Sequence, residues 1–574
     1  MKDDINDATA ADKQFDFLRG SERAAFLLRA LYEKYGYRKY RMGKFEEYDF
    51  YTGYKDFLPG GQILAFTDLD GKLMALKPDV TMSIVKRTRA APDRPERLYY
   101  NESIYRPARD AREYREISQI GLEYIGAVTA ETNIELVGLA LKSLARISGR
   151  FILDVSHNGY LAGLYESVDL PPDVRRESAR LMEQKNTHDL RLLLEAHGVC
   201  ADMTGRFCAL ATLCDAGKRA PPDGGGGYAS GGQSGFMRSL AEAGRLAVND
   251  KMRAALEELN ALYGAFAGDP AVGSLRLDLS SFAGDASYYN GIVMKGYVME
   301  SPRAVLSGGR YDPLLRRLGV KELEAIGFAV YLDELDAPLD GLDAPAADVN
   351  TDGPPDADTG PRTLRIALPK GRMGDKAYSL FAAAGYGCEG YGGDSRKLVF
   401  TDVKSKISFL LVKPSDVAVY VERGAADAGV AGKDTLLETT PDVYELLDLR
   451  LGRCRLAVAA PDGYVEDPAA VLRVATKYPN ITRGYYARQN REIEVIKLNG
   501  SIELAPILGV SDVIVDIVET GSTLRENNLG VREEIAPSSA RLIANINAYK
   551  FKQPEITLLL DKIKEQIYPE AKNG

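Results

Sequence analysis

Apolar residues recur at helical or strand spacing along most of this chain, and one polar gap at residues 336–361 interrupts the pattern. Before the gap, residues 15–40 carry apolar positions at helical spacing and predict one amphipathic helix that ends near Gly36. Asp70-Gly71 marks a hairpin among short strand-like runs between residues 64 and 84. The pattern then predicts these elements in order: strands at 97–106 and 115–126, a helix at 129–148, a strand at 151–155, a mostly helical stretch at 172–265, and strands at 275–279 and 291–299.

The gap at 336–361 holds five prolines, many aspartates and no aromatic residue. Such a segment cannot bury a core, and its charges repel one another, so it is typical of a flexible linker. The length of 574 residues also exceeds what one core supports. We therefore predict two large domains, residues 1–335 with a helical insertion at about 172–265, and residues 362–574.

After the gap, short β-branched runs alternate with helical patterns, which favours an α/β domain of two lobes with a ligand cleft between them. Ser415 is predicted to cap a helix that stops at Gly424, and the apolar stripe of residues 554–567 predicts a last helix packed on the first lobe. The predicted strands lie at 365–368, 407–412, 455–460, near 474, and at 513–517, and the first crossover helix lies at 378–384.

The stretch from Glu503 to Arg525 combines a strand, an acid, a hydroxyl-rich turn and a helix start. Asp516 lies near the end of the strand, where a carboxylate reaches a ligand outside the sheet. The turn Thr520-Gly521-Ser522-Thr523 lets backbone N–H groups close on a phosphate. This order suits a ribose 5-phosphate, although an ordinary βα connection with capping Thr and Ser explains the turn taken alone.

The same stretch is similar to the signature of the ATP phosphoribosyltransferase family, through Glu503, Gly509, Ser511, Ile514, Asp516, Thr520, Gly521, Thr523 and Leu524. That family joins ATP to phosphoribosyl pyrophosphate in the first step of histidine biosynthesis. The resemblance implies the following residues for binding phosphoribosyl pyrophosphate: Glu503, Asp516, Glu519, Thr520, Gly521, Ser522 and Thr523.

In the reaction that the resemblance implies, adenine N1 of ATP displaces pyrophosphate from C1 of the ribose. N1 carries no proton, so no general base is needed, and the burden is electrostatic stabilisation of the leaving pyrophosphate. Mg²⁺ is expected to arrive bound to that pyrophosphate rather than in a protein cage. The cations expected to act are Lys370, Arg372, Arg396 and Lys413, and the expected ATP contacts are Lys370, Gly371 and Arg372.

Six segments before the gap resemble, in the same order, the catalytic core of histidyl-tRNA synthetase, a class II enzyme built on an antiparallel sheet. The resemblance covers about residues 15–335. The segments are Leu76–Thr81, Tyr105-Arg106, Arg115-Glu116 with Gln119 and Glu123, Ser287–Gly291, Ser307–Asp312 and Ala325–Leu335.

Two departures affect the expected chemistry of this first half. Glu334 stands where the synthetase family has an arginine that holds ATP phosphates, and Gly284 replaces another arginine. A carboxylate repels a triphosphate, so adenylation is not expected. The first half then resembles the histidine-sensing regulatory subunit of ATP phosphoribosyltransferase. The alternative, for any one of its polar residues, is that the residue only stabilises the strand on which it lies. The expected histidine contacts are Asp79, Thr81, Arg106, Gln119, Glu123, Tyr288 and Tyr289.

The fold class expected is therefore a class II synthetase-like sheet domain followed by a two-lobed, periplasmic-binding-protein-like phosphoribosyltransferase domain. A net charge of −9 argues against a large nucleic-acid surface, and the scattered cysteines fit neither disulfides nor zinc. No apolar run of 18 residues and no signal segment occur, so no membrane partner is expected and the cytoplasm is the expected location. We also expect histidine to act as a feedback inhibitor and the chain to form a homo-oligomer. The alternatives are a small-molecule-binding protein and an active synthetase with an appended domain.

Overall fold

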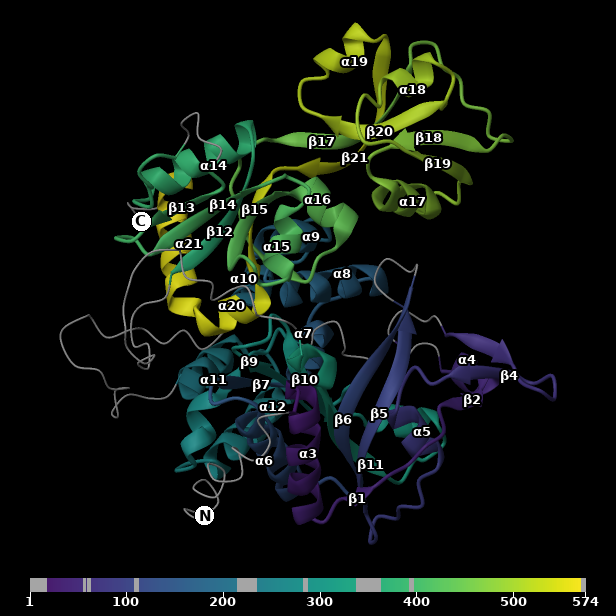
Figure 1. The fold of residues 1–574 in the computed structure, drawn as a ribbon, viewed down its shortest axis with the longest axis vertical. Helices are drawn as coiled ribbons and strands as arrows, with labels where there is room; N and C mark the ends of the chain where they lie inside the picture. The colour runs from purple at the N-terminus through teal and green to yellow at the C-terminus, as the bar shows by residue number, and fades with distance from the viewer. Residues whose placement is uncertain are drawn as a thin grey trace. The chain divides into compact units, whose positions relative to one another are not determined.

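The computed structural model describes residues 18–54, 58, 63–107, 113–213, 235–281, 288–336, 363–391 and 397–568 (Figure 1). The chain forms two compact units, one within residues 1–351 and the other within 352–574. Apart from Asp336, the predicted linker lies outside the described residues. Among those described, no helix is long and apolar enough to cross a membrane.

The N-terminal unit is built on an eight-stranded sheet in the order β1-β5-β6-β11-β10-β9-β7-β8. Its inner pairs are antiparallel and only the two edge pairs, β1 with β5 and β7 with β8, are parallel, which confirms the antiparallel sheet that was expected. The strands are β1 Arg38–Lys39, β5 Glu96–Pro107, β6 Tyr114–Gly126, β7 Phe151–His157, β8 Leu275–Leu277, β9 Ile292–Val298, β10 Ala304–Arg310 and β11 Glu324–Tyr331.

The predicted hairpin at Asp70-Gly71 is confirmed within a small sheet of order β2-β4-β3. The prediction of strand-like runs as far as residue 84 is wrong at its end, because residues 81–86 form helix α5. The predicted helices at 15–40, 129–148 and 172–265 are confirmed as α3, α6 and α8 to α12, whereas α7 was not predicted. These further elements are β2 Phe45–Glu47, β3 Ala65–Thr67, β4 Leu73–Leu76, α3 Gly20–Lys34, α4 Tyr48–Thr52, α5 Thr81–Lys86, α6 Ala130–Ile147, α7 Asn158–Glu166, α8 Pro172–Glu183, α9 Thr187–Ala196, α10 Ala201–Thr212, α11 Gly235–Leu246, α12 Asp250–Ala265, η3 Pro270–Ser274, α13 Asp312–Arg317 and η5 Leu332–Leu335.

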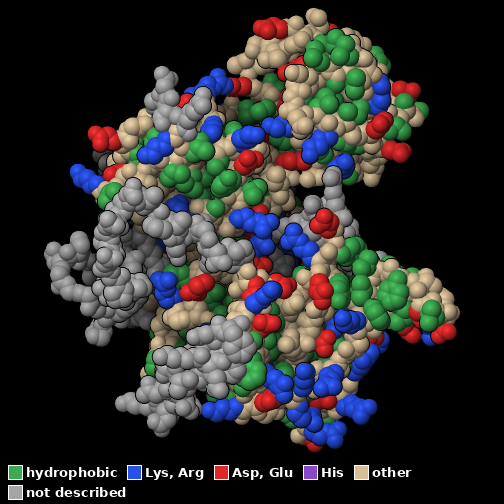
Figure 2. Space-filling view, in the orientation of Figure 1, with side chains coloured by type: hydrophobic (Ala, Val, Ile, Leu, Met, Phe, Trp, Pro, Cys, Tyr) green, Lys and Arg blue, Asp and Glu red, His purple; other side chains and the backbone are tan. Residues whose placement is uncertain are grey.

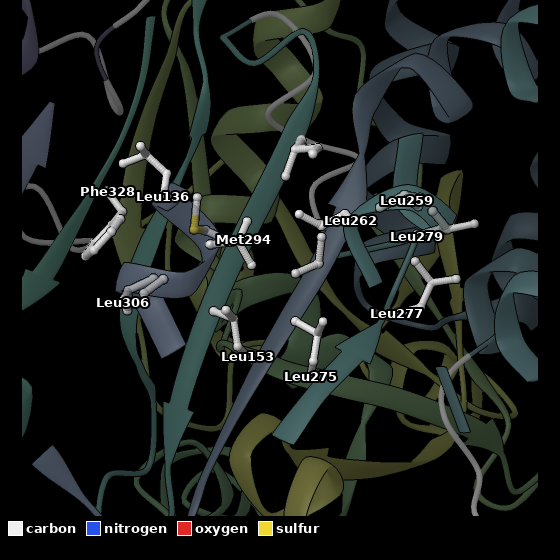
Figure 3. Close-up of a cluster of buried hydrophobic side chains, with 14 of the residues drawn as sticks. Leu136, Leu153, Leu259, Leu262, Leu275, Leu277, Leu279, Met294, Leu306 and Phe328 are labelled. Carbon is white, nitrogen blue, oxygen red and sulfur yellow. The ribbon is translucent and has the colours of Figure 1, made fainter. Parts of the chain in front are cut away.

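The main core of this unit lies between the sheet and helices α6 and α12 (Figure 3). Leu153, Leu275 and Met294 come from neighbouring strands and are at most 2% exposed. Burying one such side chain stabilises the fold by about 1.5–3 kcal/mol. Gly296 allows α6 to approach closely, because a Cβ there would lie 2.8 Å from atoms of Leu144.

The C-terminal unit has two lobes, each with its own sheet (Figure 1). The first sheet has the order β13-β14-β12-β15-β22-β16 and the second β19-β18-β20-β17-β21. Parallel strands joined by crossover helices were expected here, and β12, β14 and β15 as well as β18, β19 and β20 are parallel. However, β13 and β22 in the first lobe and β17 in the second run antiparallel to their neighbours, so both sheets are mixed. The strands are β12 Leu364–Pro369, β13 Val399–Asp402, β14 Ile407–Val412, β15 Ala428–Gly432, β16 Val443–Asp448, β17 Cys454–Pro461, β18 Leu472–Thr476, β19 Ile493–Lys497, β20 Val513–Val518, β21 Leu529–Ser538 and β22 Ala540–Asn545.

Helix α21 packs against α14 of the first lobe, which confirms the predicted position of the last helix. The predicted cap at Ser415 is wrong. Its hydroxyl donates to the Asp416 carboxylate at 2.7 Å, and the helix begins at Val417. Gly424, with φ of +74°, follows the end of that helix as expected. The helices are α14 Arg372–Ala383, α15 Val417–Glu422, α16 Lys433–Thr439, α17 Pro479–Arg488, α18 Leu504–Ile507, α19 Ser522–Glu526, α20 Ile546–Phe551 and α21 Gln553–Ile567.

The second lobe is a continuous insertion into the first, entered through β17 and left through β21. The two connections are hydrogen-bonded to each other, since the N–H of Leu449 donates to Ala540 O at 3.0 Å and the N–H of Ala540 donates to Leu451 O at 2.9 Å. Apolar side chains gather on the surface of this lobe around α18 (Figure 2). The exposed residues there are Leu504, Ile507, Leu508 and Val510, so the surface beside Glu503 is apolar.

Candidate functional site

The basic residues predicted in the first lobe lie at the carboxyl ends of two neighbouring parallel strands. Pro369 at the end of β12 pairs with Val412 at the end of β14, so Lys370 and Lys413 follow adjacent strand ends. The N–H of Lys370 donates to Val412 O at 2.8 Å. Gly371 has φ of +95°, which favours glycine and turns the chain into α14 at Arg372. Arg396 lies outside the described residues.

The signature turn of the second lobe follows β20 directly. Gly521 has φ of +71°, and helix α19 begins at Ser522, so the last two residues of the predicted turn already belong to the helix. The hydroxyls of Thr520 and Ser522 lie 3.1 Å apart, and the Arg525 guanidinium donates to Thr520 O at 3.2 Å. A cation therefore sits beside the turn, and sequence reasoning had not assigned Arg525 to the site.

Asp516 lies within β20, with two further residues of strand after it. Burial, and the nearby carboxylates of Glu503 and Asp434, raise the pKa of Asp516 to about 6, while the Ile517 N–H and Lys477 oppose that rise. Lys477 follows β18, in which Thr476 pairs with Val515 of β20. Sequence reasoning missed Lys477, because only the structure shows that the strand before it lies next to β20.

A pair of exposed charges links the two lobes. The Arg372 guanidinium of the first lobe donates to the Glu519 carboxylate of the second at 2.7 Å. The side chains are 77% and 50% exposed, so the pair contributes little to stability. Arg372 and the signature turn thus lie on facing sides of the two lobes.

In the N-terminal unit, Glu123 is the centre of a buried polar cluster. Thr81 donates to one carboxylate oxygen at 2.7 Å and Tyr311 to the other at 2.6 Å. Burial raises the pKa of Glu123 to about 8, against the effect of these two hydrogen bonds. A Cβ on Gly327 would lie 1.8 Å from the carboxylate, so only glycine leaves room for it. Tyr311 had not been assigned a role.

Most of the other residues expected to contact histidine lie around this carboxylate. Arg106 donates to Asp79 at 3.2 Å and to Pro78 O at 2.8 Å. The rings of Tyr288 and Tyr289 are 4.7 Å apart, and Tyr288 lies 6.1 Å from Tyr311. Gln119 is buried on β6 four residues before Glu123, and therefore on the same face of the strand. The structure thus brings together these residues from separate segments: Asp79, Thr81, Arg106, Glu123, Tyr288 and Tyr289. Gln119 lies about 13 Å along β6 from Glu123.

Glu334 lies in η5, which directly follows β11. Its carboxylate is 3.6 Å from the Arg303 guanidinium, so its negative charge has a partner of its own. The adjacent Asp333 accepts the N–H of Ser118 on β6 at 2.9 Å, which holds η5 against that strand. Gly284, the second departure, lies outside the described residues.

Comparison with known proteins gives a separate assignment for each unit. The ATP phosphoribosyltransferase family model matches residues 413–565, and the histidyl-tRNA synthetase family model matches residues 16–220 and 231–335, more than half of the chain. An ATP phosphoribosyltransferase from Brachyspira hyodysenteriae is 57% identical over 203 residues, which are 35% of this chain and 98% of the relative. One from a Thermoanaerobacter species is 53% identical over 204 residues, with 36% and 96% covered.

A solved regulatory subunit/histidyl-tRNA synthetase from Bacillus halodurans is 21% identical and covers 68% of this chain and 94% of its own, with a TM-score of 0.46. The curated relatives are matched over nearly their full length by the unit that carries the Glu503–Arg525 signature and the two basic strand ends. The chain therefore belongs to the ATP phosphoribosyltransferase family of pentosyltransferases, and it carries a unit of the histidyl-tRNA synthetase family on the same polypeptide.

Proposed function

We propose that phosphoribosyl pyrophosphate binds to the second lobe with its ribose on Asp516 and its 5-phosphate in the turn at 520–523. The first-turn N–H groups of a helix have no partner inside the helix, and here they follow a left-handed glycine beside the Arg525 guanidinium. The carboxylate of Asp516 accepts the ribose hydroxyls. Glu503 adds a second carboxylate close to it.

Lys370, Arg372 and Lys413 then face the pyrophosphate and the ATP phosphates. The lone pair of adenine N1 forms the new bond to C1 as the bond from C1 to the pyrophosphate oxygen breaks, and the electron pair leaves with pyrophosphate. Fixed cations stabilise this growing negative charge without reorganising. The single observation that carries the proposal is that Lys370 and Lys413 follow adjacent strand ends and that Arg372 reaches Glu519 beside the signature turn.

Mg²⁺ enters this scheme with the pyrophosphate of the substrate. Glu503 and Asp516, whose carboxylates lie close enough to affect each other, would accept hydrogen bonds from the water molecules of this ion. The ion would neutralise part of the charge on the leaving group.

The N-terminal unit is proposed to bind free histidine at the Glu123 cluster and to inhibit the C-terminal unit. Glu123 and Asp79 accept from an ammonium or imidazole N–H, and the tyrosine rings surround an aromatic side chain. Histidine inhibits only if it binds two arrangements of the protein with different affinity. Self-association of the chain is part of the proposal, and light scattering measures it.

The direct test is incubation of the full chain with ATP, phosphoribosyl pyrophosphate and Mg²⁺, with and without histidine. Formation of N1-phosphoribosyl-ATP that histidine suppresses supports both halves of the proposal. Turnover that histidine leaves unchanged removes the regulatory half only.

Arg372→Ala is expected to lower turnover by about 10²-fold at saturating substrates, because one fixed contact to a developing charge is lost. Steady-state kinetics measures the effect. Arg423→Ala is the matched control, since Arg423 lies beyond the far end of α15 from the strand ends. Turnover of Arg372→Ala equal to that of the parent would leave Arg372 as a surface charge.

Binding of ribose 5-phosphate is expected to weaken as the pH falls through 6, because Asp516, with a pKa of about 6, must be ionised to accept the hydroxyls. At pH 5 about one tenth of the carboxylate is ionised, so the affinity should fall about tenfold from its value at pH 7. Calorimetry at both pH values measures this. The phosphate of the ligand also titrates and contributes its own pH dependence. Asp516→Asn should keep that contribution and lose the one from the carboxylate. The same dependence of affinity on pH in the parent and in Asp516→Asn would contradict the assignment.

A further inference from the structure

The two lobes of the C-terminal unit also meet away from their connecting strands, where α16 of the first lobe contacts the start of α17 of the second. The Glu438 carboxylate accepts the backbone N–H of Asn480 with both oxygens at 3.0 Å and that of Ile481 at 3.0 Å. The Asn480 amide donates back to Glu438 O at 3.0 Å. A carboxylate at these otherwise unpaired N–H groups also interacts favourably with the helix dipole. One lobe thus caps a helix of the other.

A second acid on α16 makes a parallel contact. The hydroxyl of Tyr478 donates to Asp434 at 2.9 Å, and Ser538, the last residue of β21, donates to the same carboxylate at 3.2 Å. Tyr478 is 4% exposed. Asp434 and Glu438 are four residues apart and so lie on one face of the helix. Together, these two carboxylates of the first lobe bind residues 478–481 of the second lobe.

Residues 478–481 directly follow Lys477, and Lys477 follows the strand paired with β20. Holding residues 478–481 therefore fixes where Lys477 and Asp516 lie relative to the first lobe. The exposed Arg372–Glu519 pair cannot do this, since such pairs contribute little.

We propose that Glu438 is a positioning residue for the transfer reaction and that, with Asp434, it sets the distance between the ribose-binding edge of the second lobe and the basic edge of the first. This inference rests on the proposed function. If this is correct, substitution of Glu438 leaves the affinity for a ligand that binds only the second lobe unchanged. The same substitution lowers the rate of a reaction that needs groups from both lobes.

The test compares Glu438→Ala and Glu438→Gln with the full-length parent. Glu438→Ala should lower kcat on the order of 10²-fold, since small misplacements of reacting groups have effects of this size. Glu438→Gln, which keeps one acceptor oxygen, should lower kcat by a smaller factor. The affinity for ribose 5-phosphate, measured by calorimetry, should stay at the parental value in both.

Asp402→Ala is the matched control, because its carboxylate also accepts two backbone N–H groups, from Lys404 at 3.0 Å and Ser405 at 3.2 Å, but within the first lobe alone. Parental kcat in Glu438→Ala overturns the inference, as does a loss of ribose 5-phosphate binding that matches the loss of turnover. If the alanine variant does not fold, the same two readouts on Glu438→Gln decide. If the parent protein does not bind ribose 5-phosphate, the proposed ribose site is wrong. The role of Glu438 is then still tested by comparing the kcat of its variants with that of the parent.

Discussion

Asp516→Ala is expected to weaken phosphoribosyl pyrophosphate binding by about 10²- to 10⁴-fold, because in the proposed site its carboxylate accepts two hydroxyls and a hydrogen bond to a charged group contributes ~1.5–3 kcal/mol. The fold should not suffer. The raised pKa of about 6 means that the folded protein disfavours the ionised form, so stability is lost as the pH rises from the unfolded value near 3.8 through 6. Removing the carboxylate should leave the protein at pH 7 at least as stable as the parent.

Calorimetry with phosphoribosyl pyrophosphate and thermal unfolding at pH 7 together check this expectation. Asp467→Ala is the control within the same lobe, since that exposed carboxylate accepts the N–H of Ala469 at 2.9 Å in a surface loop. Unchanged binding in Asp516→Ala would remove Asp516 from the ribose site. A variant with a lower Tm and weaker binding would make the residue structural.

Glu123→Ala is expected to raise the histidine concentration needed for half-inhibition by about 10- to 10²-fold, because a buried, charge-assisted hydrogen bond to the ligand is lost. Turnover without histidine should equal that of the parent, since Glu123 belongs to the other unit. The carboxyl has a pKa of about 8, and an arriving ammonium group favours its ionised form.

Inhibition curves of the two proteins test this, with Glu116→Ala on the exposed part of the same strand as the control. Because the alanine leaves the Thr81 and Tyr311 hydroxyls without their acceptor, Glu123→Gln serves as the variant that keeps the shape of the side chain. Undiminished inhibition in both variants would place the histidine site elsewhere.

Strands β14 and β20 were predictable from their apolar runs, whereas β16 and β19 were missed although they also carry β-branched residues. The runs of β14 and β20 coincide with the predicted ranges to within one residue. Strand β15, Ala428–Gly432, is built from small residues that carry no such signal, although all five are buried. Strand β21 carries charges and a proline because it is an edge strand of its sheet.

The candidate sites show the same limit. The turn at 520–523 was found because its residues are contiguous, and Asp516 was found because it interrupts an apolar strand. Tyr311 was missed, since it meets Glu123 across 188 positions of sequence and no spacing rule connects them. Lys477 was missed for a related reason, because its proximity to Asp516 depends on which strands are neighbours.

The insertion of the second lobe into the first constrains the order in which a growing chain can fold. Every strand of the second sheet has been synthesised by residue 538, whereas the first sheet still lacks β22, which lies between β15 and β16. Five strands of the first sheet are therefore synthesised about 90 residues before the strand that completes it. The second lobe, to which the proposed function assigns the ribose, can therefore be synthesised completely before the sheet behind the basic strand ends of the first lobe is finished.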